Sequence, residues 1–311
     1  MYNEELKSKF IRQYTQSIST AKHAVTIFNT FEPHEYNWGA DLCTKNTADL
    51  QPIVNDLVGF RRRSRWMTLA ILKEYVKWCL GTGVPGSCDG MLYVEICDLS
   101  KMRSHMVSGP LHLQRYLNSF LEKESEETVD NIYRCFYWLA YAGLFEEEAF
   151  LITVDDVELN SLTINYKGLG FPIYREAIPA FKNAVELTGF YYKHPKYSEI
   201  IWRDRAQGNT LLRGFRDNMK PLTVRALLSS RGAAAVKDGK TDQQLSYYRV
   251  WLSGLFYRMR EAECAGFPVS FADATARFME GKEYKNPKIQ FTKIAKEYYE
   301  DYQRWKMAFF I

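Results

Sequence analysis

The chain has 311 residues, of which 46% are hydrophobic and 25% are charged, so we expect a folded protein large enough for two domains. Its formal net charge is only +4, which excludes a globally basic surface and means that binding to nucleic acid would need clustered cationic side chains. The N-terminal sequence lacks the long apolar core of a signal peptide, and no run approaches the ~18 apolar residues of a membrane span. We therefore expect a cytoplasmic protein without a membrane partner.

Six cysteines are spread along the sequence without a Cys-x-x-Cys pair. They are Cys43, Cys79, Cys88, Cys97, Cys135 and Cys264. Because they lie within helical or strand-like patterns, we expect reduced, buried thiols rather than a zinc site. The sequence indicates no metal and no cofactor.

Residues 1–84 carry the periodic apolar pattern of four helices. These are 4–17, a second that Ser19 or Thr20 caps and that ends before Pro33, a third from Asn46 to Leu57, and a fourth that stops at Gly81. The apolar face predicted for the fourth helix comprises Trp66, Leu69, Ala70, Leu72, Val76 and Leu80. Residues 85–107 contain several turn-forming residues and a brief strand-like segment at 91–96, and we interpret them as a linker.

Residues 108–311 combine helices with a predicted hairpin. Two helices, 111–121 and 128–141, are followed by Gly143, which favours a helix end. A short acidic helical turn at 146–148 precedes a strand around Leu162 and Ile164, a turn at 166–170 and a returning strand at 171–174. The later predicted elements are a helix from about 179 to 187, a short strand at 199–202, and helices at 211–218, 222–236, 243–264, 269–280 and 292–307. The expected fold class is mainly α with a small antiparallel β-sheet.

The order of elements between Leu139 and Asn165 resembles the opening of the catalytic domain of tyrosine recombinases, the phage integrase family. Ala142-Gly143-Leu144 matches the family's helix-ending turn, and Glu148-Ala149-Phe150 and Val154-Asp155-Asp156-Val157 match the residues that follow it. The four N-terminal helices resemble the family's core-binding domain, which clamps DNA opposite the catalytic domain. The resemblance implies a two-domain clamp: a core-binding-like domain at 1–84, a linker at 85–107 and a catalytic-like domain at 108–311.

The recombinase reaction needs a tyrosine nucleophile and cationic donors that stabilise the charge on the phosphate. The resemblance puts the family's first catalytic arginine at Phe145 and its second at Ser253, neither of which can present a guanidinium group. Lys167, at the tip of the hairpin, falls where the family has a lysine. The nucleophile would be Tyr298, Tyr299 or Tyr302, although their helical spacing also suits tyrosines that only pack. We therefore expect no strand cleavage.

DNA binding is the function that the resemblance leaves, with double-stranded DNA as the partner. The densest cationic cluster, which we call the arginine cluster, is Arg61, Arg62, Arg63 and Arg65 at the start of the fourth helix, where backbone N–H groups also favour phosphate. An ordinary solvated helix start is the alternative. Further candidates for DNA contact are Lys22, Lys73, Lys77, Lys167, Arg213, Arg216 and Arg225.

Among phage proteins, the pattern is most similar to the integrase-like repressors that maintain lysogeny in SPβ-type phages of Bacillus, which implies a transcriptional repressor at operator sites. Two alternatives remain open. One is an active recombinase with displaced catalytic residues, for which Arg258 or Arg260 could supply a guanidinium group. The other is a structural or partner-binding protein that does not contact DNA.

Overall fold

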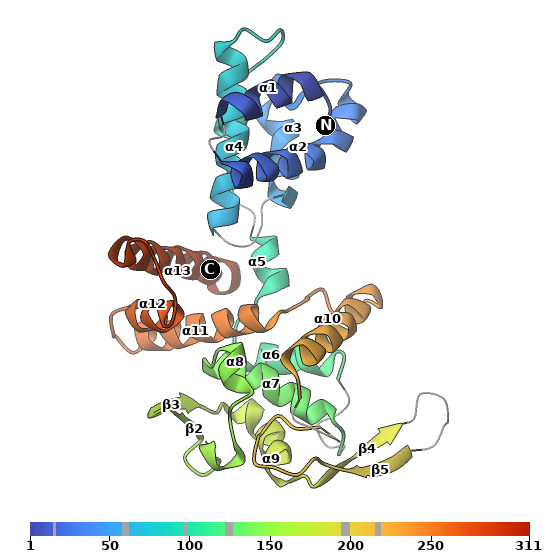
Figure 1. Cartoon of the computed structure of the whole chain (residues 1–311), viewed down its shortest axis with the longest axis vertical. Coiled ribbons are helices and arrows are strands. Elements are labelled where there is room, and N and C mark those ends of the chain that lie inside the picture. Colours follow the sequence, from blue (N-terminus) through green and yellow to red (C-terminus); the bar gives the residue numbers. More distant parts are fainter. Residues whose placement is uncertain (15–16, 58–61, 96–98, 122–126, 194–199, 215–218) are drawn as a thin grey trace. The chain divides into compact units, whose positions relative to one another are not determined.

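Figure 1 shows a computed structural model of the chain, which describes all residues except 15–16, 58–61, 96–98, 122–126, 194–199 and 215–218. It also leaves the side chains of residues 56–57, 62–66 and 192–193 undescribed. The chain is mainly helical with small antiparallel sheets, which confirms the predicted fold class. It divides into two compact units: residues 1–101 with 296–301, and residues 102–295 with 302–311.

The first unit is a helical bundle built from α1 (Glu4–Tyr14), α2 (Ile18–Trp38), α3 (Thr47–Leu57) and α4 (Arg62–Gly81) (Figure 1). Two short 3-10 helices, η1 (Leu42–Thr44) and η2 (Gly90–Tyr93), follow α2 and α4, and α5 (Ser100–His105) begins at its end. All four bundle helices contribute to one apolar core, whose members include Phe10, Ile27, Phe28, Phe31, Leu50, Val54, Leu72, Tyr75 and Val76. Burial of this core is what holds four individually marginal helices together.

Helix α2 differs from the prediction at both ends. Its N-cap is Ser17, whose hydroxyl accepts a hydrogen bond from the Thr20 N–H, rather than Ser19 or Thr20. The helix also continues through Pro33 to Trp38. Proline removes one ladder hydrogen bond, but the last turns are held by the N–H of Gly39, which bonds to carbonyl groups of the last turn, and by the buried carboxylate of Glu35.

Two further predictions for this unit are wrong. The apolar face of α4 is rotated from the one predicted, because Leu80 is exposed while Ile71, Tyr75 and Cys79 are buried; Trp66 lies outside the described side chains. The segment at 91–93 forms part of the 3-10 helix η2 instead of a strand. Its N-terminal Gly90 lies so close to the residues after η1 that an added Cβ would meet the Lys45 carbonyl oxygen at 2.3 Å, and the strands of the two described sheets pair elsewhere.

An ionic network lies inside the first unit. The Lys7 ammonium group, with no exposed surface, pairs with the Glu35 carboxylate and lies 3.8 Å from Asp41. Glu35 also accepts a hydrogen bond from the Leu42 N–H at 2.9 Å, and the Tyr75 hydroxyl donates to Asp41 at 3.0 Å. Since buried charges are tolerated only when paired, this network makes Lys7 a structural residue of the bundle.

The second unit combines helices with two small sheets. Its first elements are α6 (Pro110–Asn118), α7 (Asp130–Ala142), α8 (Glu146–Ala149), η3 (Val154–Asp156), β1 (Val157–Glu158), β2 (Thr163–Tyr166), β3 (Leu169–Pro172), η4 (Arg175–Ala177) and α9 (Ile178–Glu186). Its later elements are β4 (Gly189–Lys193), β5 (Ile200–Asp204), α10 (Pro221–Lys237), α11 (Tyr247–Cys264), α12 (Ala272–Met279) and α13 (Pro287–Phe310). Strands β1, β2 and β3 form one antiparallel sheet in that order, and β4 pairs with β5 in another.

Helix α7 is the centre of this unit and packs against α9 and α11. Nearly all of its side chains are buried, including Arg134, Trp138 and Tyr141. The helices α7 and α11 approach so closely that a Cβ added at Gly254 would lie 2.0 Å from the carbonyl oxygen of Tyr141. Glycine is therefore required at this crossing, and it fixes the position of α11 against α7.

The predicted helix at 211–218 is wrong over the described residues 211–214, which are not helical. The buried guanidinium group of Arg205 donates to the carbonyl oxygens of Ala184, Leu187, Leu211 and Arg213. Carbonyl groups that bond to Arg205 are not available for a helical ladder, and this satisfies the polar backbone of an irregular segment. Strand β4 was not predicted either.

No helix in the described part of the chain combines the length and the apolar character that crossing a membrane demands. Of the cysteines in the described ranges, all five are free thiols; Cys43, Cys79 and Cys135 are buried, as expected, but Cys264 is exposed and Cys88 partly so. Cys97 lies outside the described residues. Within those ranges, no three His, Cys, Asp or Glu side chains are grouped so that they could hold a metal ion.

Candidate functional site

The turn after α7 positions the residue that corresponds to the first catalytic arginine. Gly143 ends the helix with a φ of 117°, a left-handed conformation that favours glycine, and its N–H bonds to the carbonyl groups of Leu139 and Ala140. The chain then turns through Leu144, whose side chain is buried, to Phe145. Residue 145 is thereby held at the edge of a cavity rather than in the core.

Phe145 is integrated into an aromatic cluster. Its ring stacks on Trp251 of α11, with centroids 5.2 Å apart and planes inclined by 27°. Trp251 in turn stacks on Tyr248 at 5.6 Å and donates its indole N–H to the carbonyl oxygen of Gly143 at 3.0 Å. The phenylalanine is thus part of the packing between the turn and α11.

Arg277 of α12 places a guanidinium group beside Phe145, and no sequence motif identifies it. The guanidinium carbon lies 4.9 Å from the ring centroids of both Phe145 and Phe171. One terminal nitrogen donates to the Gly143 carbonyl at 3.0 Å, and the other pairs with Glu148 at 2.7 Å. The same Glu148 oxygen accepts the Phe145 N–H at 2.7 Å, so this arginine joins α12 to the turn and to the hairpin.

Two other positions suggested by the resemblance lie in different surroundings. Ser253 is buried; its hydroxyl accepts the Val107 N–H at 3.1 Å and donates to the Arg249 carbonyl at 2.8 Å. Lys167 is exposed in the two-residue turn between β2 and β3, with a φ of 51°, and its ammonium group lies 5.2 Å from the Tyr166 ring centroid. Lys167 lines the same cavity as Phe145, whereas Ser253 does not.

The three candidate nucleophiles share helix α13 but differ in exposure. Tyr302 is fully buried, stacks on Trp305, and donates its hydroxyl to Glu263 at 2.6 Å. Burial and the neighbouring Glu263 raise the pKa of Tyr302 above its usual range, which disfavours the phenolate that would attack a phosphate. Tyr298 is buried as well, while Tyr299 is 48% exposed.

The arginines proposed as displaced catalytic groups are engaged elsewhere in the second unit. Arg258 donates to the Tyr141 carbonyl oxygen at 2.5 Å. Arg260 lies with its guanidinium carbon 3.8 Å from the Phe310 ring centroid. Neither lines the cavity at Phe145.

This cavity, which we call the Phe145 cavity, has a volume of about 560 Å³. Its walls come from the turn after α7, the tip of the β2–β3 hairpin, α11 and the end of α12. The lining residues are Phe145, Glu146, Glu147, Glu148, Lys167, Tyr247, Tyr248, Trp251, Arg277, Phe278, Glu280, Gly281 and Lys282. It combines an aromatic wall with charged groups of both signs.

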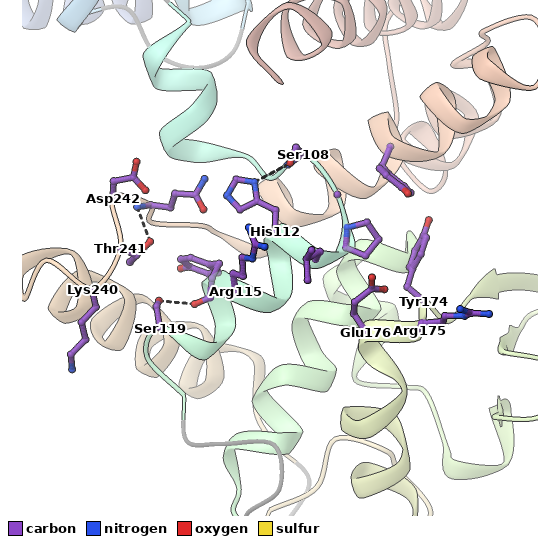
Figure 2. A pocket seen from close by; sticks show the side chains of 16 residues that line it. Ser108, His112, Arg115, Ser119, Tyr174, Arg175, Glu176, Lys240, Thr241 and Asp242 are labelled. Atoms are coloured by element: carbon purple, nitrogen blue, oxygen red, sulfur yellow. Dashed lines mark hydrogen bonds between the residues drawn. The ribbon is translucent and has the colours of Figure 1, made fainter. Parts of the chain in front are cut away.

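A second cavity, of about 750 Å³, lies between α6, η4 and the segment that precedes α11 (Figure 2). His112 is among its lining residues, and its Nδ1 accepts a hydrogen bond from the Ser108 N–H at 3.2 Å. Burial lowers the pKa of His112. Figure 2 shows the side chains of Lys240 and Arg175 extending away from the space between the elements, so the lining does not gather charge of one sign.

The structure locates the candidates for DNA contact only in part. Arg61 and Arg216 lie outside the described residues, and Arg62, Arg63 and Arg65 belong to the first turn of α4 with side chains that are not described. Lys73 donates to the Leu92 carbonyl at 2.8 Å, and Lys77 pairs with Glu74 at 2.7 Å.

The remaining candidates are distributed over both units. Arg225 pairs with Glu146 at 2.7 Å, and Arg213 donates to the carbonyl oxygen of Gly208. Lys22 and Lys167 are exposed, and neither forms an ion pair with any described residue. These two are therefore the described candidates whose ammonium groups are available to phosphate.

Comparison with known proteins gives one family match. Residues 1–81 match the family described as "MrpR, N-terminal core-binding domain". No curated protein matched the chain. Among solved structures, one titled "Crystal structure of XerA recombinase" is similar at 12% sequence identity, over 98% of this chain and 97% of that one, with a TM-score of 0.39. The N-terminal unit of this chain is thus similar in sequence to a core-binding domain.

Proposed function

We propose that the protein binds double-stranded DNA in a sequence-specific manner and performs no recombination chemistry. The match of residues 1–81 to a core-binding domain carries the binding part of this proposal. The matched segment includes the start of α4, where the arginine cluster meets the positive end of a helix. The two units would hold the duplex between them as a clamp.

The surroundings of Phe145 support the absence of chemistry. A phenylalanine that stacks on Trp251 cannot donate hydrogen bonds to a phosphate, and Ser253 is occupied by backbone groups. Loss of a single transition-state donor lowers a rate by about 10²–10³. With two arginines replaced and Tyr302 bonded to Glu263, cleavage would be negligible.

An active recombinase is the second candidate, and one observation favours it. Arg277 brings a guanidinium group to the Phe145 cavity, which Lys167 also lines. Against this alternative, the terminal nitrogens of Arg277 bond to Gly143 and Glu148. Tyr298, Tyr299 and Tyr302 are also absent from the described lining of that cavity.

We expect no covalent protein–DNA adduct to form. The test uses genomic sites identified by footprinting the bound protein, prepared as nicked duplexes that trap a cleaved strand, with denaturing gels to detect the adduct. Tyr299→Phe and Tyr302→Phe variants should bind these sites like the parent protein, provided that they melt at the same temperature. A denaturant-resistant adduct that disappears in one Tyr→Phe variant would establish the recombinase alternative.

The arginine cluster should bind DNA phosphates. Four arginines within five residues cannot all face the bundle, because successive helical residues lie about 100° apart. Changing Arg62 and Arg63 to Ala should weaken binding to all DNA sequences and flatten the slope of log affinity against log salt by about 0.9 for each phosphate that is no longer neutralised. Titration by fluorescence anisotropy at several salt concentrations measures both quantities.

The matched control for this experiment is the pair Lys9→Ala and Arg12→Ala on the exposed side of α1, which removes the same charge elsewhere. It should change the slope much less. If the Arg62/Arg63 variant keeps the parent affinity and slope, the cluster is a solvated helix start and DNA contacts another surface.

We further propose that the protein acts as a phage repressor in the bacterial cytoplasm, associated with the nucleoid, and that it maintains lysogeny by occupying operator sites. The support is the similarity between its sequence pattern and integrase-like repressors. Genomic footprinting should place its sites over promoters of lytic genes, and transcription from these promoters should rise when the protein is depleted. Sites at a single attachment locus, with no transcriptional response, would argue for recombination instead.

A further inference from the structure

The Phe145 cavity contains a π-rich wall that the proposed function does not use. Phe145, Trp251 and Tyr248 stack in sequence, with successive centroids 5.2 and 5.6 Å apart. The faces of such rings attract organic cations, and tryptophan does so most strongly. The volume of about 560 Å³ is within the usual size range of small-ligand sites.

The same wall already holds one cation of this chemical type. The guanidinium group of Arg277 lies 4.9 Å from the Phe145 and Phe171 ring centroids and pairs with the carboxylate of Glu148. Aromatic faces combined with a carboxylate therefore form a guanidinium site within this structure. Further aromatic surface and further carboxylates line the same cavity.

Two carboxylates at the cavity are available to a ligand. Glu147 and Glu280 are exposed lining residues, and neither carboxylate forms an ion pair or hydrogen bond with another described residue. Glu146, by contrast, pairs with Arg225. Lys282, the cation nearest in sequence to Glu280, lies 3.6 Å over the Phe278 ring and donates to the Phe278 carbonyl. The two carboxylates thus leave local negative charge beside the aromatic wall.

We propose that the Phe145 cavity binds an organic cation, a guanidinium or alkylammonium group, by stacking on the Trp251–Tyr248 wall and pairing with Glu147 and Glu280. The group belongs either to a small free amine or to a basic side chain of a partner protein. Binding a cation here does not depend on DNA binding and is tested on the DNA-free protein, so either proposal can fail without the other.

Isothermal titration with agmatine, which carries a guanidinium and an ammonium group, tests the site directly. We expect one molecule to bind per chain. Changing both Glu147 and Glu280 to Gln should weaken binding about five- to tenfold, since each exposed charge pair contributes modestly. Lys167→Gln should tighten binding, because it removes a like charge from the cavity. Glu283→Gln, an exposed carboxylate outside the lining, is the control and should change nothing.

The peptide Gly-Arg-Gly, titrated in parallel, distinguishes the two sources of the cation. Tighter binding of the peptide than of agmatine assigns the site to a basic protein segment, and the reverse assigns it to a free amine. Absence of binding by both probes up to about 10 mM, which corresponds to less than about 3 kcal/mol of affinity, would overturn the proposal. Unchanged agmatine binding in the Glu147/Glu280 variant, or binding of inorganic phosphate in place of agmatine, would overturn it as well.

Discussion

Replacing Lys7 by methionine should lower the free energy of unfolding of the N-terminal unit by about 3–5 kcal/mol, the usual cost of removing one partner from a buried ion pair. Lys7 and Glu35 have no exposed surface, and Asp41 lies 3.8 Å from the same ammonium group. Methionine fills a similar volume but leaves two buried carboxylates without their cation. Thermal unfolding of the full chain, with hydrogen exchange of the α1–α4 amides, measures the destabilisation and locates it.

The pH dependence gives this prediction a sign that simple loss of packing would not. Burial raises the pKa of Glu35, and the charge of Lys7 is the main influence that lowers it. A carboxyl group whose pKa is raised by folding favours the fold most in acid and less as the pH rises through its folded pKa. Because the Lys7→Met variant raises this pKa further, its destabilisation should be smaller in acid than at neutral pH.

Lys9→Met, an exposed position two residues further along α1, is the control and should change stability by no more than about 0.5 kcal/mol. Adding Glu35→Gln to Lys7→Met should recover part of the stability, because a neutral amide needs no cation and its oxygen can still accept the Leu42 N–H. Equal destabilisation of the single and double variants at every pH would show that Lys7 acts through its apolar stem alone.

Local sequence signals predicted the elements whose ends depend on local chemistry. Gly143 ends α7, Asn46 accepts the Asp49 N–H at the start of α3, and two positive-φ residues, Lys167 and Gly168, close the β2–β3 hairpin. Where tertiary contacts decide, the prediction was wrong. Pro33 remains inside α2, whose last turns are stabilised by the buried Glu35, and Arg205 holds residues 211–214 in an irregular conformation.

The same division applies to the candidate site. That residue 145 lies at a turn beside a cavity followed from the helix-ending glycine and the order of the elements. The contribution of Arg277 could not be predicted, because it lies more than 100 residues from its partners Gly143 and Glu148 and has no motif. The buried state of Tyr302 agrees with its spacing from Trp305, which the sequence associates with packing.

The crossing of α7 and α11 offers the second large effect. Gly254→Ala would place a methyl group 2.0 Å from the carbonyl oxygen of Tyr141 and 2.7 Å from its carbonyl carbon, distances that a Cβ atom does not reach. Since both contacts are with backbone, no side-chain rotation can relieve them, and α11 must move away from α7. We expect the free energy of unfolding of the second unit to fall by about 3 kcal/mol or more, at the upper end of overpacking effects.

Movement of α11 should also be visible in the Phe145 cavity, because Trp251 and Tyr247 of that helix bond to the carbonyl groups of Gly143 and Leu144. Hydrogen exchange should therefore rise in the α7–α8 turn as well as in α11. The control is Gly81→Ala at the end of α4, where an added Cβ meets nothing within 4 Å and stability should change by less than about 1 kcal/mol. If Gly254→Ala is as stable as Gly81→Ala, the close approach of the two helices is not a feature of the protein in solution, and the positions of Trp251 and Phe145 that depend on it must be revised.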